Sequence, residues 1–290
     1  MANFIVDDLK RTFNGDDNLS KILIINVVVF IVLNLILVFG DSAVDQFMLN
    51  ALALPSGTLD VLTHFWTLLT YQFTHEGLFH LVVNLLWLYW IGKIFIEFQG
   101  HGRFLTLYLL GGLSGGLVYI LIGLIPGVYG GATYLIGASG AVLAIVVATA
   151  TLVPDYTIRL LLIGPVKLKY LAVGAIVLTT ILNLNDNTGG KMAHLGGAIF
   201  GYLYIRQLQK GVNLGAPFEN FVARLRSTFQ KQPKMKVHKG GQQYASRDGS
   251  KASSKNDQAH LDKIINKISK SGYDSLSKEE KDFLFRMSNN

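Results

Sequence analysis

Long apolar runs separated by short polar connections occupy the first two-thirds of the chain. The first run, residues 22–39, is long enough to cross a bilayer and long for the core of a signal peptide. Five more runs follow, at residues 78–96, 104–125, 135–153, 170–184 and about 189–204. The pattern predicts an all-α, polytopic membrane protein built as a bundle of six transmembrane helices. The fifth run is short, so we expect its helix to extend back through residues 160–166.

The connection at residues 40–77 differs from an ordinary solvated loop. It contains acidic residues but no Lys or Arg, and it is rich in large apolar side chains such as Phe47, Phe65 and Trp66. Aromatic amphipathic material of this kind is favoured in the headgroup interface of a membrane. A loop folded on itself outside the membrane is an alternative, and the two do not exclude each other.

Composition and charge support the membrane interpretation. Charged residues make up 16% of the 290 residues, whereas a soluble domain carries about 25%. No Lys or Arg lies between Lys21 and Lys93, and 25 of the 26 basic residues fall on one side of the predicted topology. The positive-inside rule makes that side cytoplasmic, with both termini there, and favours a bacterial inner membrane. The chain has no cysteine, which excludes thiolate chemistry and disulfides.

Four segments are expected along the chain. Residues 1–21 form a cytoplasmic N-terminal segment, residues 22–208 the membrane domain, residues 209–257 a basic linker, and residues 258–290 a small helical hairpin. Within the linker, residues 218–229 have apolar positions at helical spacing, typical of an amphipathic helix on an anionic membrane surface, and residues 231–256 should be disordered. In the hairpin, Ser277 and Glu280 have the spacing of a capping box. No signature of a nucleic-acid-binding fold accompanies the basic residues.

Four polar residues converge at one depth of the predicted bundle. The second, fourth and sixth runs must cross in the same direction, so their N-terminal ends lie at the same level. Near those ends stand His80 and Asn84, Ser139, and His194. His80 and Asn84 are four residues apart and share one helix face. Polar groups of this kind inside a membrane usually face the bundle interior or a wet cavity.

The stretch Gly137-Ala138-Ser139-Gly140 admits two interpretations. Small residues allow close helix packing in lipid, while a serine between glycines can act as a nucleophile that a substrate backbone approaches closely. With His194 as the base for Ser139, and Asn84, His80 and the Ser139 backbone N–H as donors to an oxyanion, the four residues could perform acyl transfer. No acidic residue stands at this depth, so a Ser–His dyad is the economical arrangement.

These motifs resemble those of the rhomboid intramembrane serine proteases. The resemblance covers residues 22–204 and rests on three motifs in order. They are His80-Leu81-Val82-Val83-Asn84, Gly137-Ala138-Ser139-Gly140, and Ala193-His194-Leu195-Gly196-Gly197 followed by Gly201. The resemblance implies that Ser139 is the nucleophile, that His194 is the general base, and that His80 and Asn84 stabilise the oxyanion. It further implies transmembrane proteins as substrates, no cofactor, and close packing of the sixth span on the fourth through Gly197 and Gly201.

Two positions depart from the family pattern. The family's Trp-Arg pair is Trp66-Thr67 here, and Leu143 stands where an aromatic residue commonly stacks on the histidine.

Three other functions are alternatives to a serine protease. The segment His75-Glu76-Gly77-Leu78-Phe79-His80 resembles a zinc-protease motif with one residue too many. On a helix its two histidines would point about 140° apart, so we expect no metal site. A catalytically silent binder of transmembrane segments remains an alternative, whereas a transporter would require paired ionisable residues at mid-membrane.

Overall fold

The computed structural model describes residues 12–13, 15–40, 42–129, 134–160, 163–181, 187–229 and 252–288. The chain divides into two compact units, Met1–Gln232 and Pro233–Asn290. The described residues exclude residues 1–11 of the N-terminal segment. They also exclude most of the linker that is expected to be disordered.

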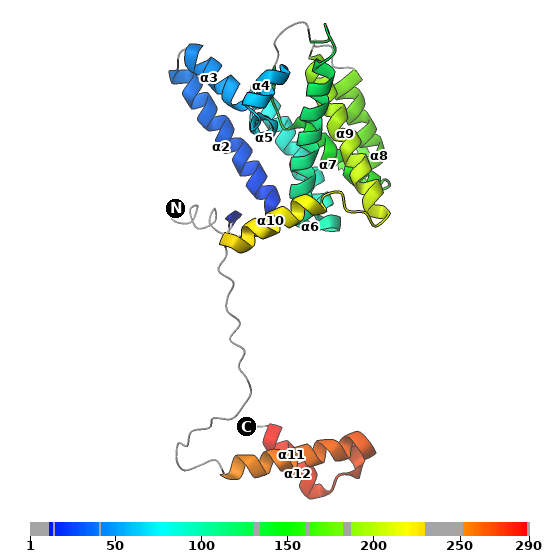
Figure 1. The fold of residues 1–290 in the computed structure, drawn as a ribbon. Helices are drawn as coiled ribbons and strands as arrows, with labels where there is room; N and C mark the ends of the chain where they lie inside the picture. Colours follow the sequence, from blue (N-terminus) through cyan, green and yellow to red (C-terminus); the bar gives the residue numbers. More distant parts are fainter. Residues whose placement is uncertain are drawn as a thin grey trace. The chain divides into compact units, whose positions relative to one another are not determined.

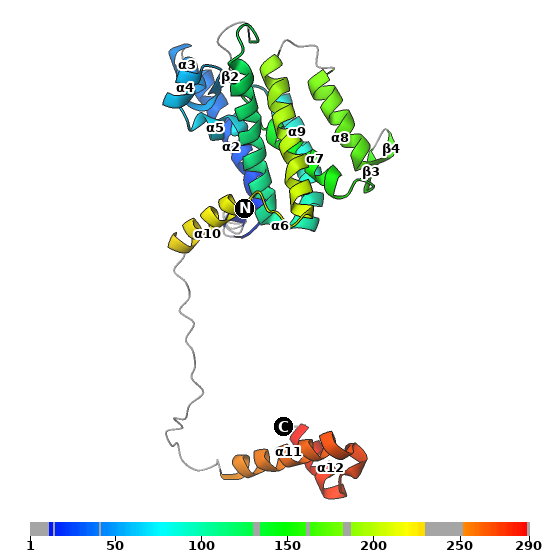
Figure 2. The same ribbon diagram turned by 45° about the vertical axis from the view of Figure 1, so that its right-hand side comes forward.

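The first unit is a bundle of apolar helices (Figures 1 and 2). Its main helices are α2 (Asn18–Phe39), α6 (Leu78–Gly123), α7 (Ser139–Leu152), α8 (Leu168–Ile176) and α9 (Thr188–Gln209). Helix α8 continues directly into a π-helical turn, Val177–Ile181. Helices α2 and α6 are long and apolar enough to cross a membrane, while α7 and the segment Leu168–Ile181 are apolar but shorter. The count of six spans therefore stays a prediction.

Helix α6 is two helices joined at Gly100. This glycine has φ +79° and ψ 168°, outside the helical region, a backbone conformation that glycine adopts without steric cost. The two halves fold back on each other, which places Gly92 of the first half against the Phe104 ring of the second. A Cβ added at Gly92 would lie 2.9 Å from that ring. Residues twelve apart in a straight helix would be about 18 Å apart. The halves match the predicted second and third spans.

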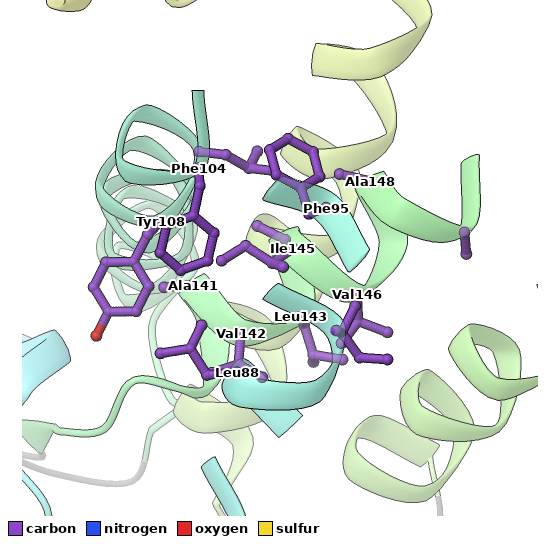
Figure 3. Close-up of a cluster of buried hydrophobic side chains, with 14 of the residues drawn as sticks. Leu88, Phe95, Phe104, Tyr108, Ala141, Val142, Leu143, Ile145, Val146 and Ala148 are labelled. Atoms are coloured by element: carbon purple, nitrogen blue, oxygen red, sulfur yellow. The ribbon is translucent and has the colours of Figure 1, made fainter. Parts of the chain in front are cut away.

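Helix α7 occupies the centre of the bundle. Every residue from Gly140 to Ala150 is buried, which is the behaviour of a helix that is apolar all round. Figure 3 shows Ile145 of α7 beside Phe95, Phe104 and Tyr108 of α6, and Val142 of α7 beside Leu88. All of these residues belong to one buried cluster, together with Leu143 and Val146.

Small residues bring α9 against α7. A Cβ added at Gly197 would overlap the backbone oxygen of Gly140, and one added at Gly201 would overlap that of Ala144. The close packing that the resemblance implied for these two glycines is therefore present. Glycine at both positions lets the two backbones touch directly.

The connection before α6 is folded rather than extended. It contains α3 (Ser42–Leu52), β1 (Leu54–Pro55), α4 (Thr58–Thr63), α5 (Thr67–Thr70) and a 3-10 turn, Tyr71–Phe73. Strand β1 pairs antiparallel with β2 (Tyr134–Leu135), just before α7. The buried Tyr71 donates its hydroxyl to the Gly112 carbonyl of α6 at 2.6 Å. Apolar side chains including Leu59, Leu62 and Phe65 are exposed on the same connection. The connection is therefore folded on itself, and its position in a headgroup interface stays a prediction.

Two predicted helix boundaries are wrong. Residues 160–166 do not extend the fifth span, because β3 (Thr157–Leu160) and β4 (Gly164–Lys167) form an antiparallel hairpin there. Gly164 has φ +86° in this hairpin, and Asp155 bridges Lys167 and Lys169 at 3.0 and 2.9 Å beside it. The fourth run begins as strand β2, so its helix starts at Ser139 rather than at residue 135.

The second unit is a helical hairpin, as predicted. It consists of α11 (Ala252–Ser271), a 3-10 turn (Tyr273–Ser275) and α12 (Lys278–Ser288). The capping box is present, since Ser277 N–H donates to Glu280 at 2.7 Å and Glu280 N–H donates to Ser277 Oγ at 3.3 Å. Lys267 of α11 contacts Glu280 at 2.8 Å, which holds the pKa of that carboxyl below its usual range. Helix α11 begins earlier than expected from the sequence.

We expect Gly201→Ala to destabilise the bundle, because the new methyl group must push α9 away from the Ala144 carbonyl. Overpacking of this kind costs about 1–3 kcal/mol. The measurement is thermal unfolding in detergent. Gly174→Ala in α8 is the control, because its added Cβ would meet nothing within 4 Å, and it should be neutral or slightly stabilising. Equal stability of the two variants would show that the α7–α9 contact can relax freely.

Candidate active site

Ser139 is the first residue of α7, and the turn that precedes it is fixed by hydrogen bonds. Gly137 has φ +112°, which favours glycine. Its N–H donates to the Tyr71 carbonyl at 2.9 Å, and the Ala138 N–H donates to His75 Nε2 at 3.4 Å. Both acceptors belong to the connection before α6. The start of α7 is therefore held against that connection.

His194 of α9 lies between Ser139 and α8. Its Nε2 is 2.7 Å from Ser139 Oγ, and its Nδ1 is 3.3 Å from the Thr179 carbonyl oxygen. A carbonyl oxygen can only accept, so Nδ1 carries the hydrogen in this contact. Nε2 is then the unprotonated nitrogen that faces the serine hydroxyl. This is the arrangement that a general base requires.

Thr179 belongs to the π-helical turn Val177–Ile181, which continues α8. The Thr179 hydroxyl donates back to Ala175 at 2.7 Å, so the hydroxyl already has a partner and the backbone oxygen serves His194.

All four residues singled out from the sequence line one cavity of about 540 Å³. Its walls come from the first half of α6, from β2 and α7, from α8 and its π-helical turn, and from the start of α9. The apolar lining includes Phe79, Trp87, Val142, Val146 and Leu178. The cavity is thus mostly apolar with a few convergent polar groups, which is the usual character of a binding site.

His80 and Asn84 occupy one wall of the cavity. Asn84 donates one amide hydrogen to the His80 carbonyl at 2.8 Å, which leaves its second amide hydrogen for another acceptor. The His80 ring lies against the backbone of Gly137, where an added Cβ would be 2.7 Å from its Cε1. Glycine at position 137 is therefore required both by the turn and by this ring.

His75 and His80 do not lie on one helix, so the expected separation of about 140° between them is wrong. Helix α6 begins at Leu78 and Gly77 is extended. The two rings lie together, with centroids 5.2 Å apart. Among the described residues, no group of three or more His, Cys, Asp or Glu side chains could hold a metal ion. Burial, together with the nearby His80, lowers the pKa of His75 to about 4. The ring is neutral near pH 7 and accepts from the Ala138 N–H.

The two departures from the family pattern have specific contacts. Thr67 is buried, and its hydroxyl donates to the His64 carbonyl at 2.6 Å. Trp66 donates its indole N–H to the Ala51 carbonyl at 2.8 Å. Leu143 is buried and lines the cavity with His194. Thr67 and Trp66 therefore hold the connection together through their own hydrogen bonds.

Comparison with known proteins gives two family matches. Residues 62–210, half of the chain, match the Rhomboid domain. Residues 251–290 match a family of unknown function, DUF6576, and this match coincides with the helical hairpin.

Curated relatives match part of the chain. Presenilin-associated rhomboid-like protein A, mitochondrial, from Danio rerio is 31% identical over 137 residues, covering 46% of this chain and 35% of that protein. The Homo sapiens presenilin-associated rhomboid-like protein, mitochondrial, is 28% identical over 138 residues with the same coverage. RHOMBOID-like protein 12, mitochondrial, from Arabidopsis thaliana is 32% identical over 184 residues, covering 58% and 52%. This chain thus spans between a third and about half of their lengths. The extent of the Rhomboid domain match shows that the chain belongs to the rhomboid family.

Proposed function

We propose that this chain is an intramembrane serine endopeptidase that cleaves peptide bonds in or next to transmembrane segments of other proteins. The observation that carries the proposal is the 2.7 Å contact between His194 Nε2 and Ser139 Oγ inside a cavity of about 540 Å³. Membership of the rhomboid family supports it.

Ser139 and His194 supply the chemistry. Ser139 Oγ attacks the scissile carbonyl carbon while His194 Nε2 takes the hydroxyl proton. The imidazolium keeps its Nδ1–H on the Thr179 carbonyl, so charge develops without rotation of the ring. His194 then gives the proton to the leaving amine as the C–N bond breaks, leaving an acyl-enzyme. A water attacks this ester with His194 again as the base, and Ser139 is regenerated.

His80 and Asn84 are proposed to stabilise the oxyanion of the tetrahedral intermediates. The second amide hydrogen of Asn84 and the ring of His80 are available on the wall next to Ser139. The free N–H groups at the start of α7 add a favourable dipole for negative charge. Donors fixed in advance in a site shielded from water are worth more than donors in solution.

The proposed setting is a bilayer that the bundle crosses six times. The spans are α2, the two halves of α6, α7, α8 with its π-helical turn, and α9. All but one of the 26 basic residues lie on one side of this topology, which supports placing both termini on the cytoplasmic side. The named relatives are mitochondrial, so the comparisons do not support the bacterial inner membrane expected from the sequence. A substrate helix must unwind locally to expose its scissile bond, because helical backbone in lipid is fully hydrogen-bonded.

The proposal predicts covalent labelling of Ser139 by a fluorophosphonate probe on the detergent-solubilised protein. Labelling should disappear in Ser139→Ala and in His194→Ala, because one variant lacks the nucleophile and the other lacks the base. Ser114→Ala is the matched control, since Ser114 donates to the Gly196 carbonyl on another face of α9. Absence of labelling in the folded wild type would favour a silent binder of transmembrane segments.

Asn84→Ala should lower kcat for a transmembrane substrate by roughly 100-fold with a small change in KM, as expected for a lost oxyanion donor. The control is Asn34→Ala on α2, because Asn34 makes the same contact with the carbonyl four residues earlier, at 2.8 Å, away from the cavity. Equal activity of the two variants would remove Asn84 from the proposed mechanism.

A further inference from the structure

Helix α10 (Ala216–Phe229) follows the bundle and lies across the end at which α2 begins (Figures 1 and 2). Its approach is fixed, because a Cβ at Gly215 would lie 2.5 Å from the Thr106 side chain and 3.2 Å from Tyr204. Glu219 accepts hydrogen bonds from the Tyr204 hydroxyl of α9 at 3.5 Å and from Asn213 in the preceding turn at 2.8 Å. These contacts attach the start of α10 to α6 and α9.

The apolar residues of α10 are on two adjacent flanks. Phe218 and Val222 are half-buried and line a cavity of about 420 Å³ with Asn18 and Leu105 of the bundle. On the next flank, the side chains of Phe221 and Leu225 are exposed. Their exposed fractions are 58% and 44%. The bundle therefore covers only part of the apolar stripe of α10.

Other apolar side chains of the same unit are exposed. Val212 and Leu214 are exposed in the turn that leads into α10. Helix α2, whose start lines the same cavity as α10, presents an exposed apolar row that includes Val28, Ile31 and Leu35. Exposed apolar surface of this extent marks a place of contact with a membrane or a partner.

Charge distinguishes between those two occupants. Residues 206–240 contain eight Lys and Arg and one acidic residue, Glu219. A basic segment of this kind next to an amphipathic helix is complementary to a membrane surface that carries anionic lipids.

We propose that α10 lies in the headgroup region of an anionic leaflet, with Phe221 and Leu225 inserted at the acyl boundary. Its partner is thus a lipid surface rather than a second protein. The inference rests on the membrane setting proposed above for the bundle. It gives the chain a second attachment to the membrane, which in the sequence comes after the last helix of the bundle and before the helical hairpin.

The test uses single-cysteine variants of the full chain, which contains no native cysteine. A nitroxide is attached at Phe221→Cys or at Leu225→Cys, and the protein is reconstituted in vesicles of neutral or of mixed neutral and anionic phospholipid. Collision with oxygen, which concentrates in lipid, is compared with collision with a water-soluble nickel chelate. Asn220→Cys is the matched control, because Asn220 is exposed about 100–140° around the same helix.

In anionic vesicles, oxygen should collide more often than the nickel chelate at 221 and 225, and the order should reverse at 220. The excess of oxygen collision should be lost in neutral vesicles and after the paired change Arg224→Gln and Arg226→Gln. A label at 221 that meets mainly nickel would place α10 in water, and one closed to both reagents would show that protein covers it. Either result overturns the proposal, as does equal insertion in neutral lipid.

A label at Ile31→Cys separates this inference from the proposed function. Ile31 is half exposed on α2 and should report lipid if the bundle crosses the bilayer. Lipid at 31 with water at 221 would reject the role of α10 alone. Water at 31 would reject the membrane setting of the bundle as well.

Discussion

The direct backbone contact between α7 and α9 is the constraint on which the candidate site depends. Ser139 and His194 stand on different helices, so the hydrogen bond of 2.7 Å between them depends on how those two helices pack. Gly197 against Gly140 and Gly201 against Ala144 provide that approach. The two interpretations of the glycine-serine stretch are therefore compatible. The packing glycines and the candidate nucleophile Ser139 belong to the same contact between α7 and α9.

The connection before α6 supplies the second constraint. It reaches the turn before Ser139 through the Tyr71 carbonyl and the His75 ring, and reaches α6 through the Tyr71 hydroxyl. Residues far apart in the sequence therefore fix the surroundings of Ser139. An apolar connection with no basic residue is suited to this role, because it can bury side chains between helices while exposing others at a membrane boundary.

Most of the apolar helices and the convergence of the four cavity residues could be predicted from the sequence, because apolar runs and helical spacing are local signals. It could not reveal that Thr179 faces His194, since that contact uses a backbone oxygen in a π-helical turn, which no side chain encodes. The two histidines at 75 and 80 were misjudged for a similar reason. Their separation was calculated for a helix, but Gly77 breaks the geometry just before α6. Continuous hydrophobicity hid the strand at residue 135. In the hairpin at residues 157–167, the apolar run from Leu160 to Ile163 resembled part of a helix, although the turn residues Gly164 and Pro165 follow it.

The π-helical turn of α8 couples the width of the cavity to the orientation of the His194 ring. Ala175, Leu178 and Thr179 form one side of the cavity, and the same Thr179 steadies the imidazole through its carbonyl. Any outward swing of α8 that makes room for a bulky guest also withdraws that oxygen from Nδ1. The ring is then free to turn or to change tautomer until α8 returns. If His194 acts as proposed, a ligand that holds α8 outward would lie beside an imidazole out of alignment, whereas a slender, unwound strand that lets α8 close would meet an aligned one.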